Sequence, residues 1–262
     1  MIERTRPAPD SPADAYPQDW LAAHLTEERR SIAWLGDIRE VVFGAQDGLV
    51  SILTVVATVA GATFASFPIL VAGAAAALAG VFSMATGEYI SSKSQRELFE
   101  ARIAGEVREV EERPGEAEAE VGYLLAQDGL PADEARIIAR VLAGHPRVLT
   151  RTMVEKELGL TVEDSSGSPL QGALLMGVAF GAGAAVPIIP FLLLPARPAL
   201  VAATILSGVV VFGIGVAKSR WTQRPWFRSG LEVLALAACA GIAGYLFGTA
   251  LPALLGFAGV SA

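Results

Sequence analysis

The sequence predicts an all-α membrane protein, a five-span transmembrane helical bundle with a helical cytoplasmic domain inserted between spans 2 and 3. Three observations predict this fold. Of the 262 residues, 53% are hydrophobic and 18% are charged, against roughly 25% charged in soluble domains. Five apolar stretches are long enough to cross a bilayer, which takes about 20 helical residues. One long polar stretch, rich in glutamate, separates the second of them from the third.

Composition divides the chain into four segments. We expect a cytoplasmic N-terminal tail over 1–36, two transmembrane helices over 37–92, a Glu-rich helical domain over 93–168 and three transmembrane helices over 169–262. The expected spans are roughly 41–66, 68–91, 170–194, 198–217 and 229–255. The first segment is polar and contains several prolines, so it does not read as a signal peptide, and the first span is expected to act as the insertion signal.

The distribution of basic residues predicts the orientation in the membrane. The loop between the fourth and fifth spans carries Lys218, Arg220, Arg224 and Arg228, whereas the first connection has no lysine or arginine. Cytoplasmic loops are the ones enriched in these residues. We therefore place the N-terminus, the 93–168 domain and this loop in the cytoplasm, and the C-terminus outside. A composition rich in alanine, glycine and arginine favours a bacterial cytoplasmic membrane, and a vacuolar membrane would keep the same topology.

Helix breakers divide the 93–168 segment into short helices. Pro114-Gly115 is predicted to be a turn, and Asp128-Gly129, Gly144-His145-Pro146 and Gly159 end the helices before them. No Gly/Pro cluster separates Ile90 from Gln95, so the second span is expected to continue into the first of these helices. Pro187 and Pro190 lie within the third span, where prolines normally bend a helix.

Asp47 lies inside the first apolar stretch. A carboxylate at membrane depth costs a few kcal/mol, and it usually faces a bundle interior or a water-filled path. Steps of three and four residues put it on a stripe of acidic, small and hydroxyl residues: Glu40, Gly44, Asp47, Ser51, Thr54, Thr58 and Gly61. The stripe is either the lining of an ion path or a helix-packing seam with one buried, protonated Asp. The cost of burying the acid favours the path.

Met84 is the counterpart of Asp47 on the second span. Each lies six residues from the cytoplasmic end of its helix, which places both about 9 Å below the same membrane face. A thioether beside a carboxylate favours iron, copper or zinc over magnesium and calcium. Met84 is equally compatible with a simple packing role. Glu40 and Glu88, near the cytoplasmic mouth, are second-rank candidates for a proton or metal relay.

Glutamates of the 93–168 domain form a second candidate site. Glu106 and Glu109 are spaced i, i+3, and Glu116 and Glu120 are spaced i, i+4, as are Met153 and Glu157. Glutamates that project from facing helices hold iron or manganese in helical bundles. The alternative is a solvated helix face paired with Arg102, Arg108 and Arg113, and composition alone favours that alternative.

Several classes of protein are not expected. One cysteine and two histidines are too few for a disulfide framework or for a metal site built on thiolate or imidazole ligands. The sequence has no HExxH motif and no Ser/Lys arrangement at membrane depth, so we do not expect an enzyme. It has no nucleotide-binding loop, so we do not expect an ATP-driven pump. Two functions remain open. The protein either moves an ion across the membrane, or it is a membrane metal sensor or scaffold that does not transport and whose acidic domain binds a partner.

The motifs together resemble the vacuolar iron transporter family. The resemblance rests on 39–51 (REVVFGAQDGLVS), on 83–93 (SMATGEYISSK), on the Gly183, Pro187, Pro190 pattern and on the Glu-rich insert after the second span. It implies export of ferrous iron, and often manganese, from the cytoplasm, coupled to inward proton movement, by a homodimer whose path lies between the first helices. It implies that Asp47 and Met84 line the path and that a metal-collecting site is formed by Glu106, Glu109, Glu116, Glu120, Met153 and Glu157.

The predicted mechanism exchanges metal for protons. A buried Asp47 is expected to hold a proton, and an arriving cation is expected to displace it. Iron or manganese is the substrate and the proton is the coupling ion, so no cofactor is expected. The expected partners are divalent metal ions, the lipid bilayer and a second copy of the chain, and no nucleic acid.

Overall fold

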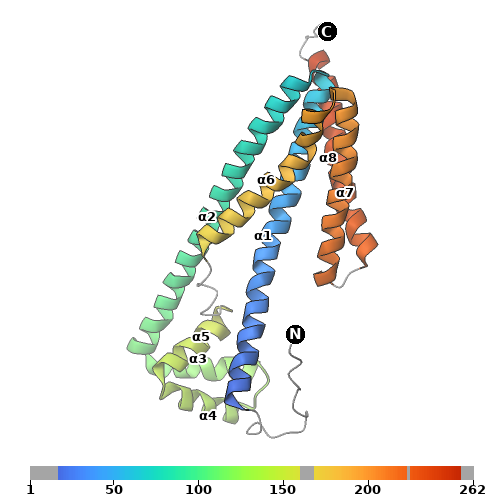
Figure 1. Ribbon diagram of the computed structural model, residues 1–262. Coiled ribbons are helices and arrows are strands. Elements are labelled where there is room, and N and C mark those ends of the chain that lie inside the picture. Colours follow the sequence, from blue (N-terminus) through green and yellow to red (C-terminus); the bar gives the residue numbers. More distant parts are fainter. Residues whose placement is uncertain (1–16, 160–167, 223–224, 255–262) are drawn as a thin grey trace. The chain divides into compact units, whose positions relative to one another are not determined.

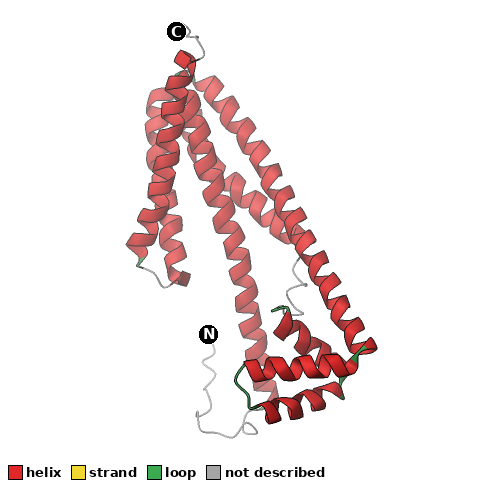
Figure 2. Cartoon of the chain, turned by 180° about the vertical axis from the view of Figure 1, so that it is seen from behind, coloured by secondary structure: helices red, strands yellow, loops and turns green. Residues whose placement is uncertain are grey.

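The computed structural model describes residues 17–159, 168–222 and 225–254, and within these ranges it contains eight helices and no strand (Figures 1 and 2). Arg224 and the expected end of the fifth span beyond Leu254 lie outside the described residues. The helices are α1 (Gln18–Ala62), α2 (Ser66–Glu112), α3 (Pro114–Gln127), α4 (Ala132–Ala143), α5 (Pro146–Glu157), α6 (Pro169–Leu193), α7 (Ala196–Thr222) and α8 (Trp226–Leu254).

Five of these helices contain a segment long and apolar enough to cross a membrane. The segments are Gly36–Ala62, Ser66–Glu112, Pro169–Leu193, Ala196–Arg220 and Trp226–Leu251. Each overlaps one of the five expected stretches, so the all-α class and the number of candidate spans are confirmed.

The N-terminal helix is longer than expected. It begins at Gln18, inside the segment expected to be a tail. Asp19 lies in its first turn, where a negative charge complements the helix dipole. Between Pro17 and the apolar part of the helix the sequence has no further proline, and Gly36 is its one glycine. The helix therefore extends well beyond its apolar part.

The helix breakers act where they were predicted, with one correction. The second span continues to Glu112 as one helix, as expected. Pro114-Gly115 is not a turn, because Pro114 is the first residue of α3. Proline fits the first position of a helix, because an N–H group at that position would make no hydrogen bond within the helix. Only Arg113 leaves the helical conformation there (φ −135°, ψ 55°). Gly129 and Gly159 follow α3 and α5 with positive φ angles of 107° and 62°, which glycine adopts without a Cβ clash.

The chain folds into two compact units. The bundle unit joins the residues up to Phe82 with those from Leu175 onward, and the inserted unit is Ser83–Leu174. The two are described separately below.

Small residues allow close helix packing in the bundle unit. Helices α1, α7 and α8 pack on one another around Leu49, Val211, Val233 and Ala237. A Cβ atom added at Gly248 would lie 1.9 Å from the carbonyl oxygen of Thr58, so α8 approaches α1 closely enough that only glycine fits. Such close approaches are typical of membrane helices, which associate by tight packing rather than by the hydrophobic effect.

The inserted unit has an apolar core of its own. Helices α3, α4 and α5 pack on one another (Figure 2), and their buried residues enclose Val110 at the end of α2. The core consists of Val110, Ala117, Val121, Ala139, Leu149 and Met153. Glu109, Glu116 and Glu120 each directly precede one of these buried residues. The core therefore fixes the positions from which these glutamates project.

Candidate metal centre

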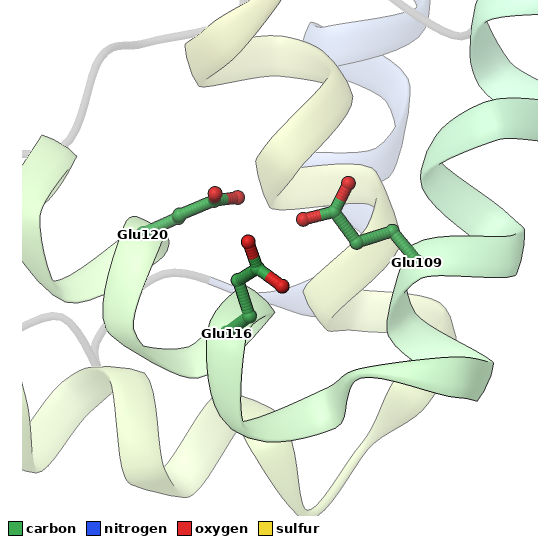
Figure 3. A group of neighbouring side chains, drawn as sticks. All are labelled: Glu109, Glu116 and Glu120. Carbon is green, nitrogen blue, oxygen red and sulfur yellow. The ribbon is translucent and has the colours of Figure 1, made fainter.

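Three glutamates converge at the junction of α2 and α3. Glu109, Glu116 and Glu120 each offer a carboxylate oxygen, and these oxygens lie within 4.8 Å of one another. Figure 3 shows the three carboxylates pointing toward one another, one from α2 and two from α3. This is the one such group of His, Cys, Asp and Glu side chains in the part of the chain that the structure describes. Three carboxylates facing a common point can bind a divalent cation.

The local sequence explains why α2 and α3 bring these residues together. Arg113 breaks the helix and Pro114 starts the next one at once, so the chain changes direction between Glu109 and Glu116. Glu116 and Glu120 are four residues apart on α3 and therefore share one face of that helix. The buried neighbours Val110, Ala117 and Val121 hold both helices against the same core.

Arg113 pairs with two members of the cluster. Its Nη1 lies 2.7 Å from Oε2 of Glu116, and its Nη2 lies 3.7 Å from Oε2 of Glu109. The arginine partner expected in a solvated glutamate face is thus present. It also neutralises part of the negative charge, and a cation bound among the carboxylates would compete with it.

Glu106 lies one helical turn before Glu109 and is buried, with 9% of its surface exposed. Its Oε2 is enclosed and accepts no hydrogen bond from the described residues. Burial, followed by the charges of Glu157 and Glu109, raises the pKa of Glu106, whereas Arg102 lowers it. An enclosed carboxylate oxygen without a donor is costly unless a proton or a cation compensates it.

Glu120 is the most strongly perturbed member of the cluster. Burial raises its pKa to about 7, together with the charge of Glu109, a side-chain hydrogen bond with Glu109, and the charges of Glu157 and Glu116. Because the carboxylates interact, their protons belong to the group rather than to single residues. The cluster can therefore hold protons near neutral pH and release them when a cation arrives.

The remaining two predicted ligands occupy different environments. Glu157, the last residue of α5, is exposed, and its charge raises the pKa of both Glu106 and Glu120. The structure thus gathers all five predicted glutamates into one electrostatic group. Met153 is fully buried in the apolar core of the inserted unit, so its role as a metal ligand stays a prediction.

The predicted path residues are spread over both units. Asp47 is half-buried on α1, and the hydroxyl of Ser51 donates to its Oδ1 at 3.3 Å. Glu40 is half-buried on the same helix. Met84 and Glu88 lie on the part of α2 that belongs to the inserted unit, where the hydroxyl of Ser92 donates to Glu88 at 2.5 Å. The meeting of Asp47 with Met84 stays a prediction.

Part of the polar stripe on α1 is a packing seam. A Cβ atom at Gly44 would lie 2.7 Å from the carbonyl oxygen of Met176 on α6, and one at Gly61 would lie 2.7 Å from that of Tyr245 on α8. The hydroxyls of Thr54 and Thr58 donate to carbonyls of their own helix at 2.8 and 2.7 Å. Asp47 and Ser51 lie between these close approaches and keep partly exposed polar groups. The ion-path interpretation of these two residues stays a prediction.

Sequence reasoning missed Phe180. This side chain of α6 is 3% exposed and lies where α6 approaches both α1 and α2. A phenylalanine in an apolar helix carries no signal of its own, and only the glycines opposite it, Gly48 and Gly80, could have indicated a close approach.

Comparison with known proteins decides the family. The model of the VIT family matches residues 38–249, which include the glutamate cluster and nearly all of the apolar helices. The chain belongs to the VIT family. This confirms the family predicted from the motifs.

Several curated relatives of this VIT-family protein carry the name vacuolar iron transporter. Vacuolar iron transporter 1 of Eucalyptus grandis is 32% identical over 209 residues, which cover 79% of this chain and 84% of that protein. Vacuolar iron transporter 1 of Arabidopsis thaliana is 31% identical over 226 residues, which cover 86% and 89%. The vacuolar iron transporter of Toxoplasma gondii is 27% identical over 228 residues, which cover 84% and 76%.

Proposed function

We propose that this VIT-family protein is a proton-coupled transporter, not an enzyme, that moves Fe²⁺ out of the cytoplasm and accepts Mn²⁺ as a second substrate. The observation that carries the proposal is the convergence of Glu109, Glu116 and Glu120 within 4.8 Å in a chain with five membrane-length apolar helices. The names of its relatives support iron as the substrate.

The glutamate cluster collects the metal. Its negative field raises the local concentration of cations, and the unpartnered oxygen of Glu106 extends the cluster inward. This step requires the inserted unit to lie in the cytoplasm. The basic residues Lys218 and Arg220 at the end of α7, and Arg228 at the start of α8, support this placement through the positive-inside rule.

Asp47 carries the exchange of metal for protons. Its carboxylate is partly exposed on α1 and accepts one hydrogen bond from Ser51, so it has lone pairs left for a proton or a cation. Cation arrival displaces the proton, and cation release allows reprotonation from the far side. Met84 supplies the soft ligand, and Glu40 and Glu88 relay ions between the cytoplasmic mouth and Asp47.

A homodimer completes the path. In a single chain Val41 and Phe43 of α1 stay exposed, and this apolar face has to be covered by lipid or by a second copy. We place the two-fold axis beside α1, so that each copy contributes Asp47. A bacterial cytoplasmic membrane, with the C-terminus outside, is the proposed location.

Metal flux into proteoliposomes tests the proposal. Wild-type protein is compared with a triple variant, Glu109→Gln, Glu116→Gln and Glu120→Gln. The matched control removes the same charge from exposed glutamates that pair with Lys93, Arg96 and Arg151, namely Glu97→Gln, Glu100→Gln and Glu155→Gln. We expect the cluster variant to raise the KM for Fe²⁺ by roughly tenfold or more, as loss of metal-site groups commonly does, and the control to match wild type.

The same assay separates the two candidate functions. No flux of Fe²⁺ or Mn²⁺ by the wild-type protein would contradict transport and would favour the sensor or scaffold. Flux with an unchanged KM in the cluster variant would remove the glutamates from the collecting role.

A further inference from the structure

Phe180 lies where three helices of the bundle unit meet. The turn of α6 that ends at Phe180 rests on the turn of α1 that carries Asp47. A Cβ atom at Gly48 would lie 2.1 Å from the carbonyl oxygen of Phe180, and one at Gly44 would lie 3.3 Å from its amide nitrogen. Backbone therefore meets backbone at this crossing, and glycines on both sides of Asp47 permit it.

The ring of Phe180 extends to the second span. A Cβ atom at Gly80 would lie 2.2 Å from Cζ and 2.3 Å from Cε1 of the ring, so the ring occupies the space that any other residue at position 80 would fill. The neighbouring residues Gly181 on α6 and Val81 on α2 are also close, because a Cβ atom at Gly181 would lie 3.3 Å from Cγ2 of Val81. One buried side chain thus spans from the Asp47 turn of α1 to α2.

We infer that Phe180 is a positioning residue that sets the spacing between α1 and α2 at the level of Asp47. The inference rests on the proposed transport function. Gly80, Phe180 and Asp47 all belong to the bundle unit, so the spacing at this crossing is set within one compact unit. A packed aromatic ring holds such a spacing because protein interiors resist compression.

The geometry suggests a pair of compensating substitutions. Gly80→Ala places a methyl group in the space of the ring, so the ring or α2 must move. Phe180→Leu removes the distal ring atoms that this methyl group would meet. The double variant therefore restores the fit that Gly80→Ala destroys. A matched control is Gly213→Ala on α7, because a Cβ atom at Gly213 meets nothing within 4 Å.

Transport kinetics distinguish positioning from simple packing. In Fe²⁺ flux measurements on proteoliposomes, Gly80→Ala is expected to raise the KM about tenfold, since displacements near one ångström at a reactive site have effects of this size or larger. The double variant is expected to return the KM to within about threefold of wild type, and Gly213→Ala to leave it unchanged. A change confined to the Vmax, or a KM that Phe180→Leu does not restore, would overturn the inference.

A distance measurement separates this inference from the proposed function. Spin labels at the exposed positions 43 and 82, in a Cys239→Ser background, report the α1–α2 spacing whether or not the protein carries metal. We expect Gly80→Ala to lengthen the distance between the labels by about 1–2 Å and the double variant to restore it. An unchanged distance in Gly80→Ala overturns the positioning role, whereas absent wild-type flux overturns only the transport function.

Discussion

The guanidinium of Arg113 binds the carboxylate of Glu116 at 2.7 Å, at the same turn where Glu116 meets Glu109 and Glu120. Arg113 therefore has two roles. It interrupts the helix between α2 and α3, and it is the counter-ion of the glutamate cluster that forms at this interruption. In the metal-free protein this cation offsets the repulsion between the neighbouring carboxylates.

Removal of Arg113 is expected to strengthen metal binding. Arg113→Gln leaves the carboxylates without their competing cation, so we expect the Kd for Mn²⁺ to fall about three- to fivefold, in keeping with the modest energy of an exposed ion pair. Calorimetry on the purified protein measures this. The control is Arg96→Gln, which removes an equivalent exposed pair with Glu100 at 2.8 Å. Weaker binding in Arg113→Gln would mean that the arginine organises the site rather than competes for it.

Metal affinity is expected to fall with acidity. Burial and neighbouring carboxylates raise the pKa of Glu120 to about 7, and a cation binds only the ionised form. Below pH 7 the Kd should therefore rise, by up to about tenfold per pH unit for each proton displaced. Titrations at pH 7.5, 6.5 and 5.5 measure the slope. Glu120→Gln should flatten it, and an equally steep slope in that variant would assign the proton elsewhere.

The metal-free protein should gain stability as the pH falls through the same window. The pKa of Glu120 in the folded state, about 7, lies above its ordinary value of 4.5. Between these values the folded state binds more protons than the unfolded state, so the free energy of unfolding decreases as the pH rises. Melting of chelator-treated protein should show a higher Tm at pH 5.5 than at pH 7.5, and Glu120→Gln should reduce the difference. A Tm that rises with pH would contradict this assignment.

Met153 should be essential for packing. It is fully buried among Val110, Val121 and Leu149, so Met153→Ala should destabilise the inserted unit by about 2–5 kcal/mol. Met153→Leu conserves volume and should cost less than about 1.5 kcal/mol. Denaturant unfolding of the inserted unit within the full chain measures both. Lower Fe²⁺ affinity in Met153→Leu, at unchanged stability, would establish the predicted ligand role, and unchanged affinity would restrict Met153 to the core.

The crossing of α1 and α6 should not tolerate a side chain at Gly183. A Cβ atom there would lie 2.1 Å from the carbonyl oxygen of Ala45, and neither backbone can yield without separating the helices. Gly183→Ala should destabilise the protein by about 1–3 kcal/mol, seen as a lower Tm in detergent. Gly213→Ala, whose Cβ atom meets open space, is the control, and equal Tm values for the two variants would contradict the close crossing.

The sequence predicted what depends on local pattern. Apolar length identified the five candidate spans, and Gly129 and Gly159 marked the ends of helices because their positive φ angles suit glycine. Pro114 was misread as part of a turn, because proline is equally at home in a turn and at the first position of a helix. Which of the two occurs depends on the packing of α3, not on the residue itself.

The sequence predicted which glutamates belong to the candidate metal site, but not how they are arranged in space. Spacing along each helix paired Glu106 with Glu109 and Glu116 with Glu120, but it could not give the angle between α2 and α3 that brings Glu109 to the other two. That angle depends on the core around Val110 and Val121. The environment of Met153 and the approach of Phe180 to Gly80 also depend on tertiary packing, which no periodicity in the sequence records.

The most direct test of the account is Fe²⁺ entry into proteoliposomes under an imposed pH gradient, with an internal pH dye, for wild type beside Asp47→Ala. We predict metal entry with opposing proton movement in the wild type, and neither in the variant, although the variant remains folded. Metal entry that persists in Asp47→Ala, or entry in the wild type without proton movement, would contradict exchange at this carboxylate.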